Sequence, residues 1–107
     1  MRLMGVAVSA VVIGLSFVGA HAQDATHGKA TFDAKCALCH NADSTDKKIG
    51  PGLKGLYARG TMADGTTKVT DESVTDRIIN GKVPMPPFKD QLTPDQIKEL
   101  VAYLKTL

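Results

Sequence analysis

A C-x-x-C-H motif at residues 36–40 constrains this chain more than any other feature of its sequence. Two thiols three positions apart can each add to one of two neighbouring vinyl groups on a porphyrin edge. Cys36 and Cys39 therefore predict covalent attachment of one c-type haem through two thioethers. His40 follows directly and is delivered beneath the iron, where a neutral imidazole is a common proximal ligand. The motif thus predicts a haem-binding chain with His40 as one iron ligand.

Two other kinds of chemistry also use a C-x-x-C pair. A zinc site needs two further ligands, but the chain has no third cysteine and would have to recruit His27, which lies upstream at no recognisable spacing. A thiol redox site of the thioredoxin kind expects a strand before the motif and a parallel sheet around it. Neither pattern is visible in the sequence, so haem attachment is the preferred interpretation.

The first 22 residues have the composition of a cleavable signal peptide. Arg2 supplies a positive charge, residues 3–20 are nearly all apolar or small, and an A-x-A cleavage site ends at Ala22. An uncleaved membrane anchor is the alternative, because an apolar run of this length is at the lower limit for spanning a bilayer. Several glycines and serines interrupt the run, so we expect cleavage, export to the periplasm and a mature domain at residues 23–107.

The chain is too short to rely on a large apolar core. It has 107 residues and a formal charge of +2, which indicates one small domain without the basic character of a nucleic-acid-binding protein. Domains of this size usually need disulfides, a metal or another constraint. Because the motif commits both cysteines, we expect the haem to provide that stability and the apoprotein to be largely unfolded.

Capping residues and apolar spacing predict a helix at each end of the mature domain. The first is expected from about Ala25, capped by Asp24 or Thr26, and should run into the C-x-x-C-H motif. The last is opened by the capping-box sequence T-P-D-Q at residues 93–96 and should reach nearly to Leu107. Its apolar residues recur at i, i+3, i+4 and i+7, which predicts one buried face.

The middle of the chain predicts loops with little helix. A short helix is expected at residues 72–80, capped by Thr70 or Asp71 and stopped by Gly81, with one helical turn near Leu56. Prolines make the segment that follows the short helix at residues 72–80 a stiff, extended loop. No alternating strand pattern occurs, so the predicted class is all-α with long loops, and such loops need something to wrap around.

Over residues 25–107 the chain resembles a small bacterial class I cytochrome c. Gly28 and Phe32 resemble the first helix of that family, which crosses the last helix at the glycine. Leu100 and Tyr103 match the partners of that phenylalanine on the last helix. The resemblance implies the cytochrome c fold: three main helices, short helical turns and long loops around one covalently bound haem.

Two loops carry the rest of the resemblance. Residues 50–53 resemble the loop in which the carbonyl of a proline, here Pro51, accepts a hydrogen bond from the proximal histidine. That bond would leave Nε2 of His40 for the iron. Arg59 follows this loop, and two interpretations of it stay open: it contacts a haem propionate, or it is a solvated charge on the surface. The sequence Pro84-Met85-Pro86 resembles the loop whose methionine completes iron coordination.

The resemblance implies His40 and Met85 as the two axial ligands. The mature chain has one other methionine, Met62, in a stretch that we interpret as flexible, whereas prolines on both sides stiffen Met85. With both axial positions filled, electron transfer is favoured over oxygen chemistry. The chain lacks tryptophan, so the residue that contacts a propionate in mitochondrial members of the family is missing.

These observations predict a periplasmic carrier of single electrons that is not an enzyme. Its expected partners are an electron donor and an electron acceptor, either soluble or bound to a membrane. No nucleic acid or small-molecule substrate is expected, and the protein should be a monomer. Two alternatives stay open: a dedicated haem subunit of a periplasmic dehydrogenase or oxidase, and a redox or gas sensor with a displaceable ligand.

Overall fold

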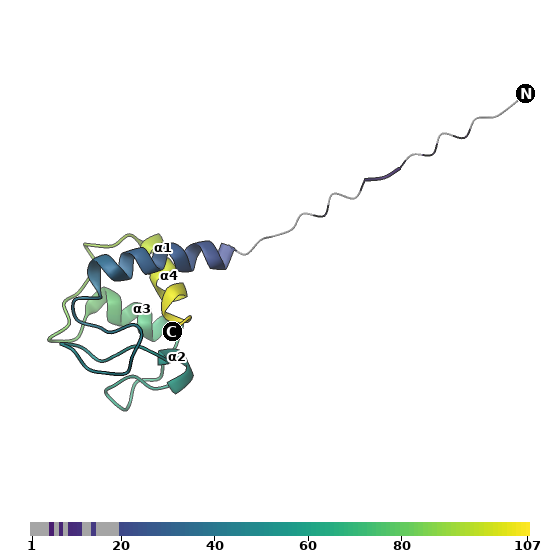
Figure 1. Cartoon of the computed structure of the whole chain (residues 1–107). Helices are drawn as coiled ribbons and strands as arrows, with labels where there is room; N and C mark the ends of the chain where they lie inside the picture. Colours follow the sequence, from purple (N-terminus) through teal and green to yellow (C-terminus); the bar gives the residue numbers. More distant parts are fainter. Residues whose placement is uncertain (1–4, 6, 8, 12–13, 15–19) are drawn as a thin grey trace, which may run out of the picture.

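The computed structural model describes residues 5, 7, 9–11, 14 and 20–107, and within them it is helical. Figure 1 shows its four helices, which are α1 (Ala20–Lys35), α2 (Leu56–Arg59), α3 (Asp71–Asn80) and α4 (Pro94–Leu104). The described residues contain no strand and only two isolated bridges. The predicted all-α class, with three main helices, one helical turn and long loops, is therefore confirmed.

The predicted leader falls mostly on residues that lie outside the described part of the chain. Its removal after Ala22 therefore stays a prediction. Among the described residues, no helix is both long enough and apolar enough to cross a membrane.

Helix α1 begins earlier than the sequence indicated. It starts at Ala20, so Asp24 and Thr26 lie inside the helix and neither is its N-terminal cap. The intervening residues include no proline or glycine, and nothing therefore stops the helix from extending backward. Its other end is as expected. The amides of Cys36 and Ala37 both donate to the carbonyl of Phe32, at 2.8 and 3.0 Å, so the helix leads directly into the motif.

Helices α1 and α4 cross each other (Figure 1). The crossing lies at Gly28, as the resemblance implies. A Cβ atom at position 28 would overlap the carbonyl oxygen of Glu99 and lie 2.6 Å from its carbonyl carbon. Phe32, one turn later, is 2% exposed, and its ring lies 5.4 Å from that of Tyr103. Leu100 is buried beside this contact. Glycine is therefore required because the two helix backbones touch.

We predict that Gly28→Ala destabilises the haem-loaded protein by about 3 kcal/mol, the upper end of the usual cost of overpacking, because the added methyl meets backbone atoms that cannot rotate away. The midpoint of guanidinium unfolding measures this effect. Ala30→Ser, at an exposed position of the same helix, is the matched control and should change the midpoint little. Equal midpoints for the two variants would contradict the close crossing.

Capping boxes start both α3 and α4. Thr70 accepts from the amide of Ser73 and the Ser73 hydroxyl accepts from the Thr70 amide, and Thr93 and Gln96 repeat the arrangement. The predicted cap of α3 at Thr70 is thus confirmed, and Asp71 is the first residue of the helix instead. Helix α4 ends at Leu104 with Lys105 as its C-terminal cap, close to the predicted end near Leu107.

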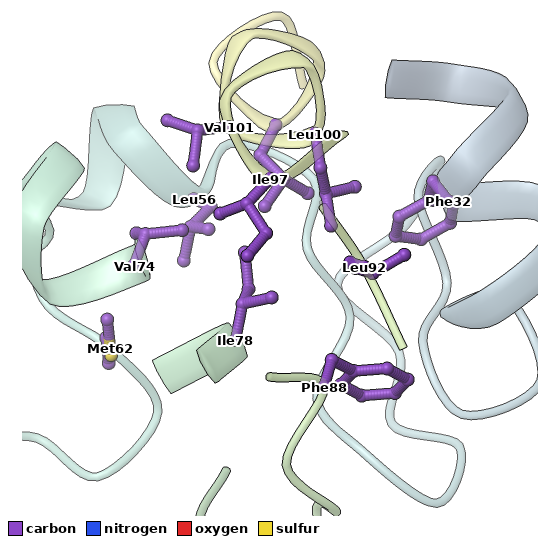
Figure 2. Packing of buried hydrophobic residues seen from close by; sticks show 11 residues of the cluster. Phe32, Leu56, Met62, Val74, Ile78, Phe88, Leu92, Ile97, Leu100 and Val101 are labelled. Atoms are coloured by element: carbon purple, nitrogen blue, oxygen red, sulfur yellow. The ribbon is translucent and has the colours of Figure 1, made fainter. Parts of the chain in front are cut away.

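The core lies where α4 covers α3 and the loops, as Figure 2 shows. Its eleven buried apolar residues are Phe32, Leu56, Met62, Val74, Ile78, Phe88, Leu92, Ile97, Leu100, Val101 and Leu104. The whole predicted apolar stripe of α4 belongs to it. Met62 is 8% exposed, so the interpretation of its segment as flexible is wrong: the side chain is buried, and its amide donates to the Thr67 carbonyl at 2.8 Å.

Candidate haem-binding site

The two cysteines lie in a tight turn that continues from α1. The amides of Cys39 and His40 both donate to the carbonyl of Cys36, at 3.1 and 3.0 Å. Both thiols are free and partly exposed, and Cys36 packs against the edge of the core. The turn therefore presents two unpaired sulfur atoms at a partly apolar surface, which is the chemistry that thioether attachment requires.

The surroundings of Cys36 do not favour the thiol redox alternative. Burial, and to a smaller degree the nearby Cys39, raise the pKa of the Cys36 thiol to about 11. A redox dithiol needs the reverse, because the thiolate is the nucleophile and its pKa is lowered in such proteins. The zinc alternative lacks ligands in the described part of the chain, where no three His, Cys, Asp or Glu side chains cluster. His27 is exposed and lies 3.7 Å from Glu99.

His40 is oriented by a backbone carbonyl. Its Nδ1 lies 2.8 Å from the carbonyl oxygen of Pro51, which is the contact that the resemblance implies. A carbonyl can only accept, so Nδ1 carries the hydrogen and donates it. Nε2 is left with its lone pair, as a histidine ligand to iron needs.

Gly50 lets the backbone pass directly over the His40 ring. A Cβ at position 50 would lie 2.6 Å from Cε1 of the ring and 3.0 Å from Nδ1. The Gly50 amide donates to the carbonyl of Cys39 at 2.7 Å, which ties the segment to the motif. The ring is thus held between its hydrogen bond and the backbone of this loop.

Two cationic side chains brace the same loop. The Lys48 ammonium donates to the carbonyl of Ala37, inside the motif, at 3.0 Å. The Arg59 guanidinium donates to the carbonyl of Gly52 at 3.1 Å, next to Pro51. The Lys48 contact could not be predicted, because residues 41–49 have no periodic pattern. The choice between a propionate contact and a solvated charge for Arg59, which the sequence left open, is not decided by this bond.

Met85 lies in a tight turn that follows α3. The Met85 amide donates to the carbonyl of Lys82 at 2.8 Å, and the Lys82 amide donates to the carbonyl of Met85 at 3.1 Å. The predicted extended loop is therefore folded back at this point. Gly81 makes this possible, since its φ of 67° suits glycine and a Cβ there would lie 2.5 Å from the Met85 carbonyl oxygen.

The residues that are present fit a c-type haem. Cys36 at the end of α1 and Met85 after α3 both pack against the same core while staying partly exposed. Leu53 is another partly buried apolar residue that packs against this core. The chain thus offers two free thiols, an imidazole with its Nε2 available and a thioether, beside apolar surface. The thiols can form thioethers with the porphyrin, and the imidazole and the thioether are ligands that haem iron takes.

Comparisons with known proteins agree with this chemistry. The family described as "Cytochrome C oxidase, cbb3-type, subunit III" matches residues 23–104. Cytochrome c6 of Leptolyngbya boryana is 36% identical over 81 residues, which cover 76% of this chain and 89% of that protein. A cytochrome c-553-like protein of Synechocystis sp. is 34% identical and covers 78% and 70% of the two chains. Cytochrome c6 of Gloeothece citriformis is 31% identical over 92% and 86%.

Proposed function

Because the chain belongs to the class I cytochrome c family, we propose that it is a periplasmic carrier of single electrons whose iron is held by His40 and Met85. Membership implies one covalently bound c-type haem, and Cys36 and Cys39 fit the attachment motif. It also makes the chain an electron carrier with redox proteins as partners, and not an enzyme. The ligand pair and the location are the proposal.

The observation that carries the ligand assignment is the 2.8 Å contact between His40 Nδ1 and the Pro51 carbonyl. It holds the imidazole in the tautomer that leaves Nε2 as a ligand. When bound, the haem supplies a centre that gains and loses one electron. Cys36 and Cys39 fix it to the end of α1, and the soft, neutral thioether of Met85 favours the reduced state and raises the potential.

Two protein ligands leave no open position for a substrate. The turn that carries Met85 is closed by two backbone hydrogen bonds and packs against the core, so its thioether has support from the fold. This favours a carrier over a gas sensor, which needs a weak or displaceable ligand. The leader at residues 1–22 supports export, cleavage after Ala22 and a periplasmic location.

A haem-bearing subunit of a dehydrogenase or oxidase is the second candidate, because the matching family is described as an oxidase subunit. A permanent subunit should expose a large apolar patch, whereas a carrier should expose a small apolar edge. Beyond the leader, the exposed large apolar side chains are Leu38 within the motif, Ile49 beside Gly50, and Val83 in the Met85 turn. These few residues on the site loops favour a carrier that is a monomer.

Purification of the native protein, with redox titration of the product, tests the proposal. A carrier should emerge alone, titrate reversibly with one electron and show negligible turnover with oxygen or peroxide. Co-purification with a dehydrogenase in fixed proportion would favour the subunit instead. Sustained turnover by the isolated chain would contradict a closed iron.

We predict that electron exchange with an acidic protein partner slows as salt concentration rises. Four exposed lysines lie near the site loops in sequence and are candidates for a docking surface: Lys35, Lys54, Lys82 and Lys89. Exposed charges are screened over about 10 Å at 0.1 M ionic strength. Stopped-flow rates at increasing salt measure the effect, with a neutral small-molecule oxidant as the control. A salt-independent rate would remove the role of the lysines.

A further inference from the structure

Asp64 is the most heavily bonded carboxylate in the described part of the chain. It lies in the loop between α2 and α3, and its side chain is only 16% exposed. Its Oδ1 accepts from the amides of Thr66 and Thr67 at 2.9 and 2.8 Å, and its Oδ2 accepts from the Thr67 hydroxyl. These bonds close the loop on itself around the carboxylate.

Two cations from beyond the loop reach the same Oδ2 atom. Arg77 Nη2 of α3 lies 3.3 Å away, and Lys82 Nζ of the Met85 turn lies 3.5 Å away. The hydrogen bonds from Thr67 and Thr66, with a smaller contribution from Arg77, hold the pKa of Asp64 well below its usual range. The carboxylate is therefore ionised at neutral pH and can attract both cations.

Arg77 and Lys82 stand on the two sides of the junction between α3 and the Met85 turn. The Arg77 carbonyl accepts from the Gly81 amide at 2.9 Å, where the helix ends. Lys82 makes both backbone hydrogen bonds to Met85. A single carboxylate thus holds the last turn of α3 and the first residue of the turn that carries the thioether.

The loop of Asp64 is itself anchored in the core. Met62, two residues earlier, is buried beside α3, as Figure 2 shows, and its backbone bonds to Thr67 and Gly65. The Met85 turn has little comparable packing, because residues 82–87 are exposed apart from Met85. Met85 itself packs against the core, and the Phe88 amide after the turn donates to the Ile78 carbonyl at 3.0 Å. On the side of the Asp64 loop, the connection between the turn and the rest of the fold is the Asp64 carboxylate.

We propose that Asp64 is a positioning residue for Met85, acting through Lys82 and Arg77. The inference rests on the proposed ligation of iron by Met85. Asp64 acts by fixing where the Met85 turn begins. After each opening of the turn, the thioether therefore returns to the same position. Loss of its charge should leave the loop hydrogen bonds largely in place and loosen the turn.

The test is Asp64→Asn in the full, haem-loaded protein. Imidazole competes for the position of the methionine in the oxidised protein, so its binding rate at high imidazole concentration reports how often the turn opens. We expect this rate to rise about two- to fivefold, because Lys82 is 59% exposed and ion pairs between exposed charges contribute little. The sulfur-to-iron charge-transfer band should weaken as well.

Asp76→Asn, which removes an exposed charge from α3 that bonds to Asn80, is the matched control and should leave both readouts unchanged.

Lys82→Gln tests the route of the effect. It should raise the imidazole rate in the wild-type background and add little in the Asp64→Asn background, while Lys98→Gln, at an exposed lysine of α4, should do neither. If Asp64→Asn lowers the unfolding temperature but leaves the imidazole rate at the wild-type value, the inference is overturned and Asp64 is structural only. If the wild-type protein lacks the charge-transfer band, the proposed ligation by Met85 fails instead.

Discussion

The double variant Cys36→Ala, Cys39→Ala is expected to yield no folded domain. The core of eleven buried residues is small, and the described residues contain no disulfide that could replace the lost constraint. Burial of a few hundred Å² of porphyrin at about 25 cal/mol per Å² is worth on the order of 10 kcal/mol, comparable with the net stability of a whole domain. Circular dichroism and the amount of protein recovered from the periplasm measure the loss.

Leu38→Ala is the matched control for that variant. Leu38 lies between the two cysteines and is 80% exposed, so the substitution changes the motif without removing a thiol. It should leave the haem attached and the fold intact. Denaturing gels of the wild-type protein should keep their peroxidase stain, because thioethers survive denaturation. If acid acetone extracts the colour instead, the haem is not covalently attached.

Met85→Ala is expected to remove the sulfur-to-iron charge-transfer band of the oxidised protein. The potential should fall by on the order of 0.1 V, because axial ligands set haem potentials over about 0.8 V and the thioether favours reduced iron. Absorption spectra and a redox titration measure the two effects. The fold should persist, since Met85 lies at the edge of the core and not within it.

Met62→Ala is the control for the ligand assignment. Met62 is the buried methionine, so its truncation should cost about 2–5 kcal/mol of stability, the usual range for such a cavity. The charge-transfer band and the potential should nevertheless stay as in the wild type. Loss of the band in Met62→Ala with its retention in Met85→Ala would reverse the assignment.

Local sequence signals predicted the main helices. Capping boxes at Thr70 and Thr93 depend on residues three positions apart, and the apolar stripe of α4 depends on helical spacing, so both can be read from a few residues. The contact between His40 and Pro51 was implied by the family resemblance. The close approach at Gly28 was also implied by the resemblance, and it agrees with the cost of a glycine within a helix that has no packing reason.

Contacts between distant segments could not be predicted in this way. The burial of Met62 depends on how its loop folds against α3, and a stretch rich in glycine and polar residues was therefore interpreted as flexible. Asp64 meets Lys82, 18 positions later, only in the folded chain. The start of α1 was placed too late because residues that can cap a helix can also lie inside one.

Carbon monoxide binding to the reduced protein at neutral pH tests the central claim most directly, because carbon monoxide takes only an open position on ferrous haem iron. If His40 and Met85 both hold the iron, the wild-type spectrum should change little when the gas is added. The Met85→Ala variant should respond at once, which shows that the assay detects an open site. Rapid carbon monoxide binding by the wild-type protein would contradict the account, since it would show that Met85 is absent from the iron or easily displaced, as a sensor or a catalyst requires.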